Sequence, residues 1–174
     1  PSTQPYLPPS RLAVVLGLVG SGHVMSHVYI LTLPPLFALI KAELDVSYAA
    51  LGLMVTMFHV ATGIMQVPAG MMVDRFGARI MLVIGMLVSA LSISAIGVVD
   101  SYVMMVCLTA LAGVGNSVFH PADYAILAAS VRTKHLGKAF GFHLLAGNLG
   151  FAVAPVLLAS LAALWDWRSA VIAV

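Results

Sequence analysis

The chain has 174 residues, of which 61% are hydrophobic and 8% charged, and its mean hydropathy is +1.07. A soluble domain carries about 25% charged residues, because its surface faces water. Eight basic and six acidic side chains cannot cover such a surface, which excludes an ordinary soluble enzyme, a disordered tail and a nucleic-acid binder. We therefore predict an integral membrane protein that has the lipid bilayer as its partner, needs no cofactor and binds no nucleic acid.

Apolar runs divide the chain into membrane spans. Residues 1–10 are rich in proline and predict a flexible cytoplasmic tail, whereas residues 11–174 predict a transmembrane bundle. A spanning helix needs about 20 apolar residues, and five runs are long enough: 12–40, 49–72, 80–98, 102–122 and 139–164. A sixth run begins after Arg168 and is cut short, so we expect a piece of a longer protein. The predicted fold class is an all-α membrane protein, a six-transmembrane-helix bundle with a truncated sixth helix.

The distribution of basic residues predicts the orientation. With the N-terminus in the cytoplasm, only Lys41 and Arg168 lie outside. The cytoplasmic side then holds the other six basic residues: Arg11, Arg75, Arg79, Arg132, Lys134 and Lys138. An excess of Lys and Arg marks the cytoplasmic loops of membrane proteins. We predict a multi-pass plasma (inner) membrane protein with a cytoplasmic N-terminus.

Polar side chains inside apolar spans are energetically costly, and they often mark a solute or ion pathway. Four of the five spans carry such residues, and we expect a pathway for solute or protons lined by His23, His27, His59, Asn116, His120 and Asn148. The span 80–98 contains Gly85, Ser89, Ser92 and Ser94 but no histidine, asparagine, glutamine or charged residue, and it predicts a lipid-facing support.

Other interpretations of these residues stay open. A histidine can form a packing hydrogen bond, and spaced glycines often only let two helices approach. Asp123 is expected near the cytoplasmic interface, and Pro121 predicts a bend. His23 and His27 lie one helical turn apart and could share a metal ion with His59, but no acidic residue or cysteine is expected at their depth. We therefore predict no metal site.

The loop between the second and third spans contains the pattern G-x-x-x-D-R-x-G-x-R. Its members are Gly70, Asp74, Arg75, Gly77 and Arg79, which we call the latch motif. Gly70 permits close backbone approach, and Gly77 favours a turn conformation. A basic turn exposed to water would explain the charged residues of this loop without any further role. The complete pattern, between two spans, resembles the major facilitator superfamily, in which it joins helices 2 and 3 of the N-terminal half.

Further stretches support the resemblance over residues 11–174. Gly141, Gly150 and Ala154-Pro155 resemble the spaced glycines of the superfamily's fifth helix, although Ala154 replaces a glycine. Within the superfamily, the chain is most similar to the fosmidomycin-resistance-type efflux proteins. The stretches that carry this likeness are Ser26-His27, Leu44-Asp45-Val46-Ser47-Tyr48-Ala49 and Asn116-Ser117-Val118-Phe119-His120-Pro121-Ala122.

The resemblance implies a function. It implies the N-terminal half of a twelve-helix secondary active transporter, not an enzyme, which moves a small-molecule solute by alternating access together with a C-terminal half. Proton-coupled efflux is expected, although Thr109 stands where antiporters of the superfamily have arginine. The latch motif would hold the halves together on the cytoplasmic side, and Gly147, Gly150 and Pro155 would gate the fifth span. The alternatives are an importer or symporter of carboxylate or nitrate type, or a membrane metal-binding protein that uses His23, His27 and His59.

Overall fold

A computed structural model describes residues 8–174. The described residues form helices and short connections, without a strand. The elements are α1 (Pro9–Ile30), η1 (Pro34–Leu36), α2 (Phe37–Leu44), α3 (Tyr48–Phe76), α4 (Ala78–Ile96), α5 (Tyr102–Asn116), α6 (Phe119–Ser130), η2 (Thr133–His135), α7 (Leu136–Leu164) and α8 (Trp167–Ala173). Five segments are long and apolar enough to cross a membrane: Pro9–Leu44, Tyr48–Phe76, Ala78–Ile96, Tyr102–Ser130 and Thr133–Leu164. The predicted all-α membrane fold is confirmed.

The chain begins its first helix earlier than expected. Most of the predicted tail, residues 1–7, lies outside the described residues, but Pro9 and Ser10 already belong to α1. The first span is also not one continuous helix. Because Pro34 and Pro35 cannot donate backbone hydrogen bonds, α1 ends at Ile30 and the chain resumes through η1 into α2.

The fourth span differs from its predicted bounds. Its helix is interrupted between α5 and α6, at Ser117 and Val118. The interruption lies just before Pro121, whose missing N–H leaves the Ser117 carbonyl without its helical partner. The expected bend is therefore present. Beyond Pro121, however, the helix continues to Ser130 instead of ending near Ala122.

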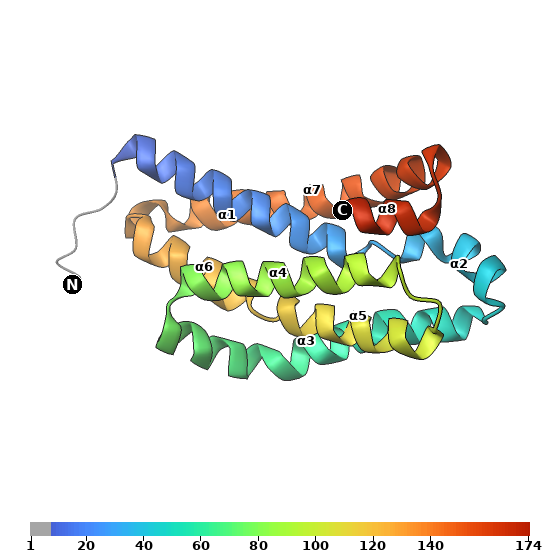
Figure 1. Ribbon diagram of the computed structural model, residues 1–174. Helices are drawn as coiled ribbons and strands as arrows, with labels where there is room; N and C mark the ends of the chain where they lie inside the picture. Colours follow the sequence, from blue (N-terminus) through green and yellow to red (C-terminus); the bar gives the residue numbers. More distant parts are fainter. Residues whose placement is uncertain (1–7) are drawn as a thin grey trace.

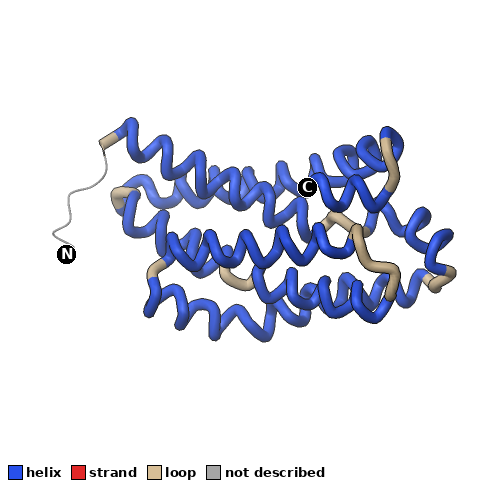
Figure 2. The backbone as a smooth tube through the Cα atoms, in the orientation of Figure 1, coloured by secondary structure: helices blue, strands red, loops and turns tan. Residues whose placement is uncertain are grey.

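The two ends of the bundle differ in charge. The start of α1 and the α3–α4 and α6–α7 connections lie at one end, on the left of Figures 1 and 2. These segments carry the six basic residues predicted to share one side, and we call this the basic end. The opposite end holds α2, the α4–α5 connection and the turn into α8 (Figure 1).

Small residues let the helices approach closely. α4 meets α5 where a Cβ added to Gly85 would lie 2.7 Å from the Gly115 carbonyl oxygen. A Cβ on Gly113 of α5 would collide with the Phe58 carbonyl oxygen of α3, and one on Gly150 of α7 with the Val24 carbonyl oxygen of α1. Such contacts are typical of helix packing in membranes, where van der Waals contact replaces the hydrophobic effect.

The apolar core is continuous only toward the opposite end. One large cluster there includes Val28, Ile96 and Trp167, and a smaller one near the basic end includes Val19 and Ile126. Along α1, His23 lies between Val19 of the smaller cluster and Val28 of the larger one. Polar side chains thus occupy the layer where the large core stops.

The span 80–98, expected to be a lipid-facing support, corresponds to α4. Its large side chains Val83, Leu87 and Leu91 are exposed on the bundle surface. On its opposite face Ser89 is buried and donates a hydrogen bond to the Ala112 carbonyl, 3.0 Å away. α4 therefore packs through its small residues and presents an apolar face outward.

Candidate functional site

Ionisable side chains from three helices meet in the interior of the bundle. Asp123 of α6 is fully buried, and His23 of α1 and His143 of α7 are nearly so. Asp123 Oδ2 lies 3.5 Å from His23 Nδ1 and 3.7 Å from His143 Nε2. We call His23, His120, Asp123 and His143 the His–Asp cluster.

Ring contacts extend this cluster along α1 and α6. The imidazoles of His23 and His143 stack with centroids 3.7 Å apart, and His120 meets His23 edge-on at 5.3 Å. One ring nitrogen from each of His23, His120 and His143 lies within 4.8 Å of the other two. His27, one turn after His23, packs its ring against His23 at 4.5 Å and against Phe151 at 4.1 Å.

Gly147 makes room for these rings. It lies one turn after His143 on α7, and a Cβ there would approach His27 Cε1 to 2.7 Å and His23 Nε2 to 2.8 Å. Real Cβ atoms do not come so close, so any larger side chain must displace both imidazoles. The glycines of α7 therefore shape the site as well as the helix contact.

Most polar atoms of the site have no protein partner. Within residues 8–174, several buried atoms lack a hydrogen-bond partner: His23 Nδ1, His27 Nδ1, Asn116 Oδ1, His120 Nδ1, both oxygens of Asp123 and both ring nitrogens of His143. Buried polar groups are nearly always bonded to protein, water or an ion. Inside a membrane bundle, such unpaired groups mark a site for a polar ligand, an ion or water.

The predicted pathway residues separate into two groups. His23, His27 and His120 come together, with Asn116 one turn before His120. His59 and Asn148 are instead exposed on α3 and α7. His59 Nδ1 lies 2.8 Å from the Val55 carbonyl oxygen, and Asn148 donates to the Leu144 carbonyl at 3.0 Å. Both thus bond their own helix and not the cluster.

The interfacial position expected for Asp123 is wrong. Because α6 runs on to Ser130, Asp123 lies about two turns inside the helix and is fully buried. The placement of His59 beside His23 and His27 also differs from the structure, which brings His120 and His143 there instead. His143 could have been found from its stripe with Gly147 and Gly150, because residues three or four apart share one helix face.

The latch motif lies at the basic end, between α3 and α4. Gly77 has φ +92°, a conformation that other residues rarely adopt, so the expected turn glycine is present. Asp74, Arg75 and Arg79 are exposed, and Gly70 is half-buried with its Cβ position 4.0 Å from Pro121.

Three residues were expected to gate the fifth span, which is α7. Gly147 and Gly150 are buried against α1 of the same bundle, whereas Pro155 is exposed. Close contact between α7 and α1 within the bundle therefore explains why these two positions are glycine.

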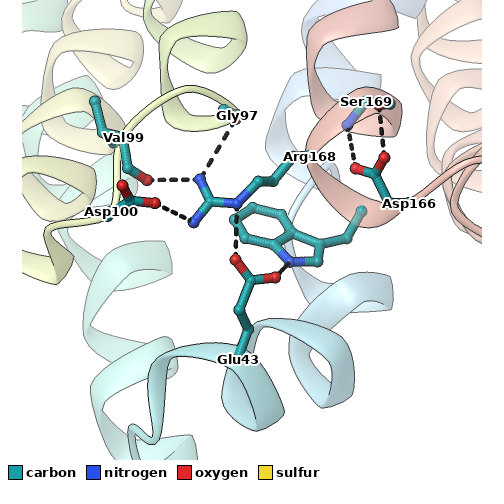
Figure 3. Close-up of polar contacts among 8 residues, drawn as sticks. Glu43, Gly97, Val99, Asp100, Asp166, Arg168 and Ser169 are labelled. Atoms are coloured by element: carbon teal, nitrogen blue, oxygen red, sulfur yellow. Dashed lines mark hydrogen bonds and ion pairs between the residues drawn. The ribbon is translucent and has the colours of Figure 1, made fainter.

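A second group of charges lies at the opposite end and is fully paired. Arg168 of α8 bonds Glu43 at 2.8 Å and Asp100 at 2.7 Å (Figure 3). It also donates to the Val99 carbonyl at 2.8 Å, and Trp167 Nε1 donates to Glu43. We call Glu43, Asp100, Trp167 and Arg168 the Arg168 network; it ties together α2, the α4–α5 connection and α8.

The turn before α8 is closed by a helix cap. Asp166 accepts hydrogen bonds from the backbone N–H and from the hydroxyl of Ser169, both at 2.8 Å (Figure 3). These two bonds lower the pKa of the Asp166 carboxyl below its ordinary value. The carboxylate satisfies an otherwise unpaired N–H at the helix start, which fixes where α8 begins.

Comparisons with known proteins identify the family of this fold. The chain is 31% identical over 129 residues to a protein named probable L-galactonate transporter from Escherichia coli K12, covering 74% of this chain and 28% of that protein. It is 24% identical over 145 residues to the fosmidomycin resistance protein of the same organism, covering 83% of this chain and 36% of that protein. Multidrug resistance protein 1 of Bacillus subtilis is 33% identical over 121 residues, which cover 70% of this chain and 31% of that protein.

The chain thus spans about a third of the length of the curated relatives it matches. The predicted likeness to fosmidomycin-resistance proteins is confirmed. A family model described as Major Facilitator Superfamily matches residues 8–174. With five apolar spans, the turn at Gly77 and this match over nearly the whole chain, the protein belongs to the Major Facilitator Superfamily.

Proposed function

We propose that the chain is the N-terminal half of a secondary active transporter that moves a small solute by alternating access, with proton-coupled efflux as its activity. The observation that carries the proposal is the buried, unpaired His–Asp cluster in the bundle of a superfamily member. Polar groups of this kind build solute and proton pathways in membranes, because lipid offers them no other partner.

The names of the relatives support export. Two of them are a fosmidomycin resistance protein and a multidrug resistance protein. A histidine changes charge near neutral pH, and a carboxylate beside it can hold the same proton, so the His–Asp cluster suits proton coupling. The relative named probable L-galactonate transporter favours a sugar acid as a second candidate solute, and uptake is the alternative direction of transport.

The full protein would supply a C-terminal half. In this proposal, the exposed faces of α3 and α7 that carry His59 and Asn148 are covered by that half, so these two residues join the pathway at the contact between halves. Gly147, Gly150 and Pro155 would then let α7 move when the halves rock. The second half would also meet the latch motif.

The charge of the two ends supports a cytoplasmic basic end, and with it a cytoplasmic N-terminus in the inner membrane. The latch motif is then on the cytoplasmic side. A cysteine placed at Arg75 of the full-length protein should react with a membrane-impermeant maleimide only after the cells are opened. Labelling of intact cells would overturn this orientation.

The activity is tested by comparing cells with and without the full-length protein. The retained amounts of fosmidomycin, ethidium and L-galactonate are measured after equal loading. Efflux predicts lower retention of at least one compound in the expressing cells, and abolition of the difference by a protonophore. Higher retention would support uptake instead, and no difference for any compound would count against both.

A proton role for His23 can be separated from solute binding. Replacement by glutamine removes the titratable group but keeps a hydrogen-bonding side chain. We expect His23→Gln to abolish transport driven by a pH gradient in proteoliposomes while solute exchange persists. Unaltered gradient-driven transport in His23→Gln, His27→Gln and the double variant would eliminate this role.

A further inference from the structure

Three histidines of the His–Asp cluster form a ligand set suited to a transition-metal ion. Three imidazoles are a common ligand set of Zn²⁺ and related first-row divalent ions. The nitrogens of His23, His120 and His143 already lie within 4.8 Å of one another, although the residues come from three different helices. The Asp123 carboxylate faces two of these rings.

The Asp123 carboxylate lies beside the imidazoles without a direct hydrogen bond to them. An N–H···O bond measures about 2.7–3.2 Å, and the two His–Asp separations, 3.5 Å and 3.7 Å, exceed that range. Two ligand atoms that share a tetrahedral zinc ion, each about 2.0–2.2 Å from it, lie roughly 3.4 Å apart. The three histidine nitrogens, which lie within 4.8 Å of one another, would therefore move closer together when they share an ion.

The burial of the cluster and its missing hydrogen bonds also favour a bound cation. Asp123, His23 and His143 are buried, and both Asp123 oxygens and both His143 ring nitrogens lack a hydrogen-bond partner in the described part of the chain. An unpaired buried carboxylate is strongly unfavourable, and a cation beside it removes that cost. His120 is half-buried, and its Nδ1 atom is also buried without a hydrogen-bond partner in the described part of the chain.

The sequence argument against a metal site rested on the absence of an acidic ligand at the depth of the histidines. The position of Asp123 removes that objection, and Gly147 keeps the space beside His23 free of a side chain. We propose that His23, His120 and His143 bind one divalent transition-metal ion of the Zn²⁺ or Co²⁺ class, with the Asp123 carboxylate beside them to offset its charge. This site does not depend on which solute the protein transports.

The test uses the purified full-length protein, stripped of metal with a chelator and titrated with Co²⁺. Tetrahedral Co²⁺ has strong visible d–d bands, whereas hydrated Co²⁺ is nearly colourless. We expect these bands to saturate at one Co²⁺ per protein and to disappear when Zn²⁺ is added. Absence of the bands in the wild-type protein, with no rise in thermal midpoint on adding Zn²⁺, would overturn the proposal.

Variants locate the site. Loss of a residue that only supports a metal ligand lowers affinity about 10–100-fold, which is the loss expected for Asp123→Asn. Removal of a ligand in His143→Gln should lower the affinity at least about 100-fold. The control is His135→Gln, which changes an exposed histidine before α7 and should bind Co²⁺ like the wild type. Monodisperse elution and an unchanged helical spectrum identify the variants that are folded.

Two outcomes distinguish this proposal from the transport function. Stoichiometric Co²⁺ binding that survives in both His143→Gln and Asp123→Asn would place the ion elsewhere and overturn the assignment. Solute flux by a protein that binds no Co²⁺ would overturn the metal site while leaving the proposed function intact.

Discussion

The Arg168 network and the His–Asp cluster both gather ionisable side chains from several helices, but they differ in pairing. Arg168 bonds two carboxylates and a backbone carbonyl at 2.7–2.8 Å. In the cluster, Asp123 has two histidines nearby and a hydrogen bond to neither. The network lies at the end of the bundle opposite the basic end, whereas Asp123, His23 and His143 are buried in the interior.

This difference in pairing indicates that the Arg168 network contributes to stability, whereas the His–Asp cluster contributes to function. A paired group contributes to holding the helices together, and its loss leaves partners without their bonds. An unpaired buried group contributes little or negatively to stability, so its presence calls for a role outside folding. We therefore expect substitutions in the two regions to have opposite effects on transport and on thermal stability.

The largest effect is expected at Asp123. Asp123→Asn keeps the size of the side chain and removes the charge, so transport driven by a pH gradient should fall at least about tenfold, since positioned proton-transfer groups contribute more than that. The thermal midpoint should stay unchanged or rise. Flux measured in proteoliposomes, together with thermal unfolding in detergent, checks both. If Asp123→Asn unfolds far more easily but retains its flux, the cluster stabilises the fold in the same way as the Arg168 network and is not needed for transport.

Close packing of α1 and α7, and not polar bonding, should hold the cluster in place. Gly150→Ala puts a methyl group against the Val24 carbonyl, and overpacking of this kind destabilises by about 1–3 kcal/mol. Gly141→Ala on the same helix is the matched control, because its Cβ position has no neighbour within 4 Å. The thermal midpoint should fall only for Gly150→Ala. Equal midpoints would show that α1 and α7 do not pack this closely.

A smaller loss of stability is expected at Arg168. Arg168→Gln removes the ion pairs to Glu43 and Asp100. Bonds to charged groups contribute about 1.5–3 kcal/mol each when both groups are shielded, and less here because the partner carboxylates are exposed. We expect a lower thermal midpoint with transport within about twofold of wild type, since small changes far from a pathway leave its chemistry intact. Lys41→Gln, on the same end, serves as the control and should change neither.

The smallest effect is expected at Asp100, whose side chain is 94% exposed. Exposed ion pairs contribute about 0–1 kcal/mol, so Asp100→Asn should lower the midpoint only slightly. The change should shrink further in high salt, which screens exposed charges. A loss as large as that of Arg168→Gln would show that Asp100, and not Glu43, carries the network.

Local sequence patterns predicted most of the fold. Apolar runs gave five spans because length and composition alone decide which segments can cross lipid. The turn at Gly77 and the bend before Pro121 followed from single-residue backbone chemistry. The error at Asp123 arose because a run ending near Ala122 was taken as the end of the helix, although the small and apolar residues after it continue the helix to Ser130.

The site was less predictable, since its members meet through tertiary contacts. His23 and His27 could be paired from their spacing on one helix, but the rotation of α7 that brings His143 to them depends on close packing against α1 at Gly147 and Gly150. Asp123 reaches His23 and His143 only because α6 packs beside α1 and α7. His59 has the depth of a pathway residue but lies on an exposed face of α3. Depth can be counted along a sequence, whereas the direction in which a helix faces is set by its neighbours.

The most direct test measures Asp123→Asn and Arg168→Gln side by side in the full-length protein, each for flux and for thermal midpoint, with a compound whose retention the wild type changes. Our account predicts a crossed result, in which Asp123→Asn loses flux and keeps its midpoint while Arg168→Gln keeps flux and loses midpoint. If flux and midpoint instead fall together in both variants, the His–Asp cluster is a structural element and not the transport site.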